Sequence, residues 1–93
     1  MITISKHDDE INISGHTDPT ICSAISSITY TCINILLELG EDISVDDNKE
    51  KDYLNIKLHN IDNNGNIIIG VMFQMFNDVL EQAPKNSLIL KVD

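Results

Sequence analysis

The stretch Gly15-His16-Thr17-Asp18-Pro19-Thr20-Ile21-Cys22-Ser23-Ala24-Ile25-Ser26 joins the end of a strand-like segment to the start of a helix. Gly15 lets the backbone change direction after the strand. Asp18 followed by Pro19 predicts a helix start, because a carboxylate caps the first amides and proline suits the first helical position. This stretch therefore sets a strand–turn–helix connection around which the other elements are arranged.

An apolar stripe continues downstream of this helix start. Its members recur at three- and four-residue spacing: Ile21, Ala24, Ile25, Ile28, Cys32, Ile35, Leu36 and Leu39. The spacing predicts an amphipathic helix that buries this stripe, and Gly40 is a suitable residue to end it.

Alternating apolar and polar residues predict strands on both sides of this helix. Ile2 and Ile4, then Ile11 and Ile13, predict a hairpin with a turn over residues 7–10. Further strands are expected at 43–45, 53–58 and 87–92, with an acidic turn over 46–52. Leu54, Ile56 and Leu58 are expected to share one buried face.

A second helix is predicted over residues 66–82, after a turn at 62–65 and before Pro84. Its expected face is Ile68, Val71, Met72, Met75 and Val79, while other sides carry Ile69, Phe73, Phe76 and Leu80. A helix that is apolar nearly all round needs a second surface to cover it. We therefore expect a homodimer.

The predicted element order is β-β-α-β-β-α-β in one domain spanning residues 1–93. Half-polar strands are typical of a sheet with one covered face. The fold class expected is α+β, in two layers, with a mostly antiparallel sheet and both helices on one face.

The chain of 93 residues carries a formal charge of −9, from fifteen acidic residues and six lysines, without arginine. Nucleic-acid binding depends on clustered cations, so this composition argues against it. The acidic residues are interpreted as a solvated surface that keeps the protein soluble, or alternatively as a surface that steers a basic partner.

The longest apolar runs are three residues, so no membrane span is expected. The N-terminal residues lack the long apolar segment of a signal peptide.

The two cysteines are not expected to form a disulfide. Cys22 and Cys32 lie about 15 Å apart along one helix, too far for an intrachain disulfide. No metal-binding spacing of Cys and His occurs, and no cofactor is expected. We interpret the chain as cytoplasmic.

Cys22 lies in the first turn of the predicted helix, where the helix dipole favours a thiolate. His16 ends the preceding strand and is close enough in sequence for its imidazole to reach the sulfur. Such a pair is typical of a nucleophile with its general base, with helix amides as oxyanion donors. Asp18 and Ser26, one turn after the cysteine, are candidate supporting residues.

A structural cysteine beside an incidental histidine is the alternative interpretation. Cys32 follows the apolar stripe and is expected to be buried. His7 and His59 lie in polar surroundings and are expected at the surface.

The segment Gly15-His16-Thr17, with Ile21-Cys22-Ser23-Ala24-Ile25-Ser26, resembles the signature of the ribosomal-processing cysteine protease family, Prp. That family has a Gly-His-Ala element and then a Val-Cys-Ala-Ala-Val-Ser helix start, and the derived element order is similar to its fold. The resemblance implies a homodimeric protease with His16 and Cys22 as the catalytic pair. Family members remove an N-terminal extension from a large-subunit ribosomal protein, and related phage proteins act on capsid or scaffold proteins.

The chain departs from the family pattern between the two catalytic positions. Its His–Cys loop is shorter and has no internal glycine, and Pro19 replaces the family aspartate three positions before the cysteine. Two hypotheses follow: a divergent or phage-type cysteine endopeptidase, or an inactive homodimeric protein that binds such a polypeptide without cleaving it.

Overall fold

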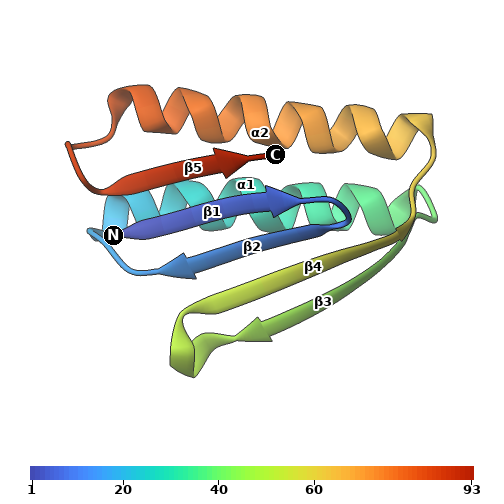
Figure 1. The fold of residues 1–93 in the computed structure, drawn as a ribbon, viewed down its shortest axis with the longest axis horizontal. Coiled ribbons are helices and arrows are strands. Elements are labelled where there is room, and N and C mark those ends of the chain that lie inside the picture. The colour runs from blue at the N-terminus through green and yellow to red at the C-terminus, as the bar shows by residue number, and fades with distance from the viewer.

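The chain forms a five-stranded sheet and two long helices in a computed structural model that describes residues 1–93 (Figure 1). The elements are β1 Ile2–His7, β2 Glu10–Gly15, α1 Pro19–Glu38, β3 Asp42–Asn48, a short 3-10 helix at Lys49–Lys51, β4 Tyr53–Asn60, α2 Asn63–Gln82 and β5 Leu88–Val92. This order confirms the predicted one.

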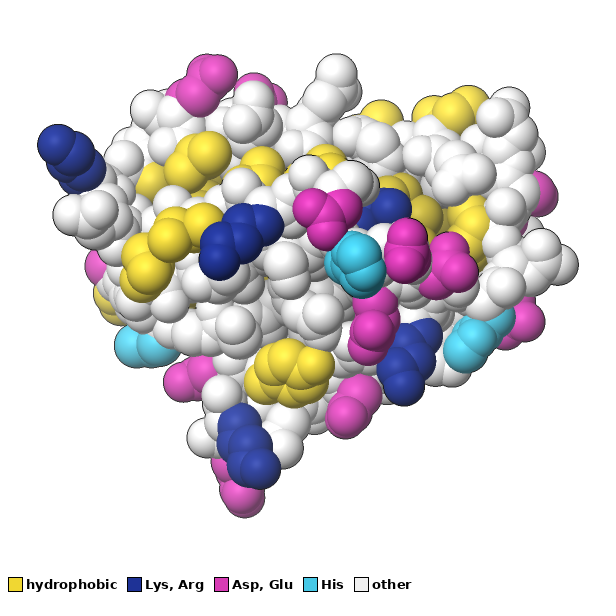
Figure 2. Space-filling view, viewed as in Figure 1, with side chains coloured by type: hydrophobic (Ala, Val, Ile, Leu, Met, Phe, Trp, Pro, Cys, Tyr) yellow, Lys and Arg dark blue, Asp and Glu magenta, His cyan; other side chains and the backbone are white.

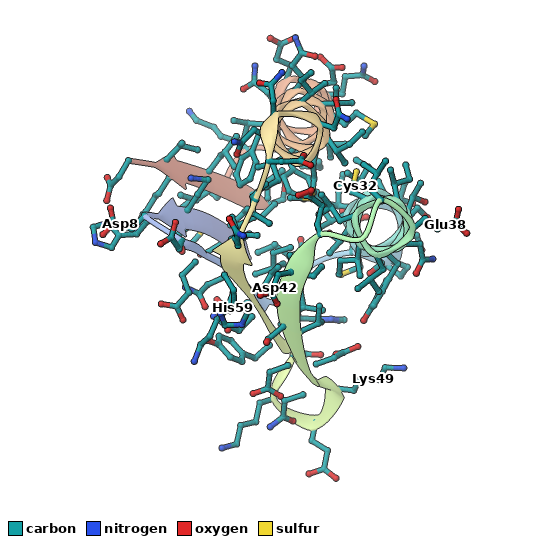
Figure 3. The ribbon with its side chains drawn as sticks, turned by 90° about the vertical axis from the view of Figure 1, so that its right-hand side faces the viewer. Asp8, Cys32, Glu38, Asp42, Lys49 and His59 are labelled. Carbon is teal, nitrogen blue, oxygen red and sulfur yellow. The ribbon has the colours of Figure 1, made fainter.

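The strands are arranged in the order β3-β4-β2-β1-β5. Only β5 runs parallel to its neighbour, β1, and the other three pairings are antiparallel. Both helices lie on the same side of the sheet, as the end-on view shows (Figure 3). The other face of the sheet carries scattered acidic, basic and histidine side chains (Figure 2). The two-layer α+β fold is therefore confirmed.

Local hydrogen bonds determine where α1 begins and ends. The Asp18 carboxylate accepts from the Ile21 amide at 3.1 Å, so α1 starts at Pro19 as predicted. At the other end Leu39 is the cap, and Gly40 takes the left-handed conformation at a φ of 78°. The Glu41 amide then bonds the Leu36 carbonyl, which completes a Schellman motif.

The buried face of α1 is rotated from the predicted stripe. Ile35 and Leu39 are 39% and 47% exposed, whereas Thr29 and Ile33 are buried. Thr29 tolerates burial because its hydroxyl donates to the Ile25 carbonyl at 2.7 Å. The predicted stripe was wrong at these positions because the buried face runs through Thr29 and Ile33, one or two positions away from the apolar residues assigned to it.

Helix α2 begins at Asn63, three residues earlier than predicted, because Asp62 caps the Gly65 amide at 3.1 Å. A Cβ at Gly65 would lie 2.3 Å from Glu41 Oε2 and 2.6 Å from Ile61 Cγ2, so only glycine fits at this position without a shift of these side chains. The buried residues Ile69, Met72 and Phe76 follow at helical spacing from Gly65. Of the predicted face only Met72 is fully buried, and the expected register was wrong.

Glu41 is a buried acid at the junction of α1, β3 and α2. Its Oε2 accepts from the Asp62 amide at 3.1 Å. Burial raises the pKa of Glu41, and the hydrogen bond from the Gly65 amide lowers the pKa of Asp62. The two carboxyl groups thus anchor the start of α2 on the end of α1.

Strand β3 extends to Asn48 and includes Asp46 and Asp47, which were predicted to lie in a turn. Pairing with β4 overrides the low strand propensity of aspartate, since Asp46 pairs with Asn55 and Asp47 with Leu54. The strand is therefore longer than expected.

Helix α1 meets the length and hydropathy criteria for a membrane span, with 20 residues and a mean hydropathy of 1.5. The expectation that no segment qualifies was wrong by this criterion. A helix that packs on a sheet satisfies the same criterion, and one third of the α1 window is buried within the fold.

Candidate active site

A cleft of about 190 Å³ lies between the first half of α1 and the sheet, at the end where β2 stops and β4 begins. Its wall on α1 and its floor on the sheet are largely apolar. The lining residues are Ile2, Ile13, Gly15, His16, Cys22, Ile25, Ser26, Thr29, Tyr30, Asp52, Tyr53 and Leu54. Both predicted catalytic residues are among them.

His16 follows a tightly constrained glycine. Gly15 has a φ of 100°, and a Cβ there would lie 2.1 Å from the Met1 carbonyl oxygen. The Gly15 amide also donates to the Asp52 carbonyl at 2.9 Å, which ties β2 to the start of β4. The His16 carbonyl accepts from the Met1 nitrogen at 2.6 Å. These bonds fix the backbone from which the imidazole projects.

Cys22 lies in the first turn of α1 and is half-buried. Its Sγ is 3.8 Å from His16 Nδ1, and the thiol donates to the Thr17 carbonyl at 3.4 Å. The fold thus brings the two residues together, with the thiol proton directed at a backbone carbonyl. Distances of this length are common in catalytic pairs without substrate.

Few amides at the start of α1 are free to bind an anion. Pro19 has no N–H, the Ile21 amide bonds the Asp18 carboxylate, and the Cys22 amide bonds the Asp18 carbonyl at 3.1 Å. Among the first four helical residues only Thr20 has an N–H without an acceptor in the chain. Of the helix amides that were expected to bind an oxyanion, the Thr20 amide is therefore the one that is free to do so.

The two predicted supporting residues have different surroundings. The Asp18 carboxylate serves as the helix cap and makes no hydrogen bond with the side chains of His16 or Cys22. Ser26 lines the cleft one turn after the cysteine. Asp18 therefore fixes the start of the helix, whereas Ser26 is exposed at the surface of the cleft.

Several solved structures are similar to this chain. One is a crystal structure of an essential ribosomal processing protease Prp from S. aureus in complex with a covalently linked product peptide. It has a TM-score of 0.87 and 18% identity, and all of both chains are covered. The chain has the fold of the Prp proteases.

Two further structures extend this finding. The S. aureus Prp in complex with a substrate peptide has a TM-score of 0.82 at 13% identity, over 99% of this chain and 97% of that one. The structure of SMU.848 from Streptococcus mutans has a TM-score of 0.79 at 17% identity, over 98% and 90%. No protein-family model and no curated protein sequence matches the chain. At these identities the likeness to Prp concerns the fold.

The remaining cysteine and histidines lie away from this cleft. Cys32 is buried, and burial raises the pKa of its thiol, which makes it a poor nucleophile at neutral pH. Exposed His7 bonds Asp93 at 2.7 Å, and this contact raises the pKa of its imidazole. His59 is exposed and 2.6 Å from Ser44 Oγ. No three His, Cys, Asp or Glu side chains are placed to hold a metal ion.

The Tyr30 side chain lines the cleft and its hydroxyl donates a hydrogen bond to Asp47, a contact that the sequence did not predict. Tyr30 follows Cys22 and Ser26 at four-residue intervals, a signal that places all three on one side of α1. Asp47 comes from a strand far along the chain, so nothing local points to it. The hydrogen bond to Asp47, followed by burial, raises the pKa of Tyr30 to about 12.

This pKa predicts an alkaline transition. Because the folded chain holds the Tyr30 proton more tightly, the bond stabilises the fold below about pH 10, the ordinary tyrosine value, and is lost as the pH rises towards about 12. In Tyr53→Phe, where Tyr30 is the sole tyrosine, tyrosinate absorbance should titrate with a midpoint of about 12. Adding Asp47→Ala should lower the midpoint towards 10.

Circular dichroism at each pH verifies that the protein is still folded during the titration. A midpoint near the ordinary tyrosine value with Asp47 present would contradict the assignment of this hydrogen bond.

Proposed function

We propose that this protein is a cysteine endopeptidase in which Cys22 is the nucleophile and His16 the general base. The observation that carries the proposal is the sulfur of Cys22 facing His16 Nδ1 at 3.8 Å in the wall of a cleft. The fold shared with proteases crystallised with peptides supports a polypeptide as the substrate.

The proposed reaction begins with transfer of the Cys22 thiol proton from its hydrogen bond with Thr17 to the imidazole of His16. The thiolate attacks the carbonyl carbon of the scissile peptide bond, and a C–S bond forms. The C–N bond then breaks as His16 returns the proton to the leaving amine. Water, deprotonated by His16, hydrolyses the resulting thioester and frees the sulfur.

The carbonyl oxygen of the substrate gains negative charge in the first step. The free amide of Thr20 is the donor that the helix start offers to this oxygen. The amide of Cys22 becomes a second donor if its bond to the Asp18 carbonyl lengthens when substrate binds.

The cleft suits a chain with apolar side chains and without acidic ones. Its lining is mostly apolar, Asp52 is its only carboxylate, and no lysine lines it. The net charge of −9 also attracts a basic polypeptide. We infer that the substrate is the N-terminal segment of a ribosomal protein or of a phage structural protein.

A second candidate is an inactive homodimeric protein that binds such a polypeptide without cleaving it. The hydrogen bond of the Cys22 thiol to Thr17, in place of a short bond to His16, favours this alternative. So does the short turn between the two residues, which Pro19 stiffens.

The endopeptidase is tested with a defined library of synthetic peptides analysed by mass spectrometry. The native protein should cut a subset at one position, while Cys22→Ala should leave every peptide intact because the nucleophile is gone. Cys32→Ala is the matched control and should retain the cuts, since this buried thiol of the same helix takes no part. Equal cleavage by native protein and Cys22→Ala would contradict the proposal.

We also infer that two copies associate through α2. Its outward residues Ile67 and Val71 are 55% and 40% exposed and lie one turn apart. Sedimentation at micromolar concentration should give twice the mass of one chain, and Ile67→Glu should give a monomer. Leu37→Glu, at a residue of similar exposure on α1, is the control. A monomeric native protein would contradict the inference.

A further inference from the structure

The wall of the cleft on α1 includes a row of three side chains, Cys22, Ser26 and Tyr30, at intervals of four residues. At 1.5 Å per residue, Tyr30 lies about 12 Å along the helix axis from Cys22. An extended chain advances about 3.3 Å per residue. The wall between the sulfur and Tyr30 therefore accommodates about three to four residues of a bound polypeptide.

Asp47 lies on the edge strand β3 beside the cleft and accepts the hydrogen bond from Tyr30, which lines the cleft. It pairs with Leu54 across β3 and β4, and Leu54 is buried on the helix-facing side and lines the cleft. Directly paired residues share a face of the sheet, so Asp47 also points to the helix side. The Tyr30–Asp47 bond is the only side-chain hydrogen bond that joins α1 to a strand.

The surroundings of this bond allow it to open. Strand β3 is at the edge of the sheet and pairs only with β4, and Figure 1 shows the β3–β4 hairpin extending beyond the helices. Tyr30 is 40% exposed, and no lysine forms an ion pair with Asp47. Water can therefore replace either partner.

We propose that the Tyr30–Asp47 hydrogen bond closes the cleft at the end away from His16 and limits the length of polypeptide that binds beside Cys22. The proposal rests on the proposed function, since it concerns the cleft that holds the substrate. Segments of up to about four residues on the Tyr30 side fit the closed cleft. A longer segment binds only when the bond opens, which makes this pair a determinant of specificity.

The test uses thiol-reactive probes of different length, with Cys22 alkylation followed by mass spectrometry. Peptidyl chloromethyl ketones extend from the sulfur towards the N-terminus of a chain, and N-iodoacetyl peptides extend towards its C-terminus. Each series contains a dipeptide and a hexapeptide with the same residue next to the reactive carbon. All rates are divided by the rate with iodoacetamide, which is too small to reach Tyr30.

In the native protein the hexapeptide of one series should react more slowly than the dipeptide. Tyr30→Phe and Asp47→Ala should each raise the hexapeptide rate about tenfold, the factor that one charge-assisted hydrogen bond supplies. The dipeptide rate should not change. The double variant should gain no more than either single one, because both remove the same bond.

Ser44→Ala is the matched control. It removes another side-chain hydrogen bond of strand β3, in which Ser44 Oγ lies 2.6 Å from His59 Nε2, and neither residue lines the cleft. Its length dependence should equal that of the native protein. Native and Tyr30→Phe proteins with the same length dependence in both series, or equal relief by Ser44→Ala, would overturn the proposal.

This outcome is independent of catalysis. Ratios between probes measure the space beside Cys22 even if its sulfur is an ordinary thiol. The proposed function is tested separately by the rate at which iodoacetamide alkylates Cys22. It fails if this rate is the same in the native protein and in His16→Ala.

Discussion

The hydrogen bond from the Ile21 amide to the Asp18 carboxylate fixes the residue at which α1 begins, and the place of Cys22 depends on it. Such caps contribute about 1 kcal/mol to helix stability. A shift of the sequence by one position along the helix would turn the cysteine by about 100° around the helix axis and away from the cleft. A local polar contact at the surface thus sets the geometry of the candidate nucleophile.

The sheet supplies the opposing half of the site through long-range contacts. Gly15 is held by Asp52 and packs against Met1, so the backbone that carries His16 is fixed by the residues that precede β4 and β1. Farther along α1, Tyr30 connects the helix to the edge strand through Asp47. One end of the cleft is therefore built from rigid backbone contacts and the other from a single, partly exposed side-chain bond.

Much of this arrangement follows from local sequence signals, and the rest does not. The Asp18–Pro19 start, the alternation of Leu54, Ile56 and Leu58, and the pairing of His16 with Cys22 are properties of short segments and were predictable. The register of α2 was not, because it depends on Gly65 packing against Glu41 from another part of the chain. Asp47 was missed for the same reason, since only its pairing with Leu54 brings it to the cleft.

The most direct measurement is the rate of Cys22 alkylation by iodoacetamide as a function of pH, in the native protein and in His16→Ala. Cys32 in the same molecule serves as the internal control, because it is buried. A functional pair predicts that Cys22 is already reactive below pH 7 and that His16→Ala shifts or removes this reactivity. A profile with a midpoint near the ordinary thiol value of about 8.5, unchanged in His16→Ala, would contradict the catalytic pair.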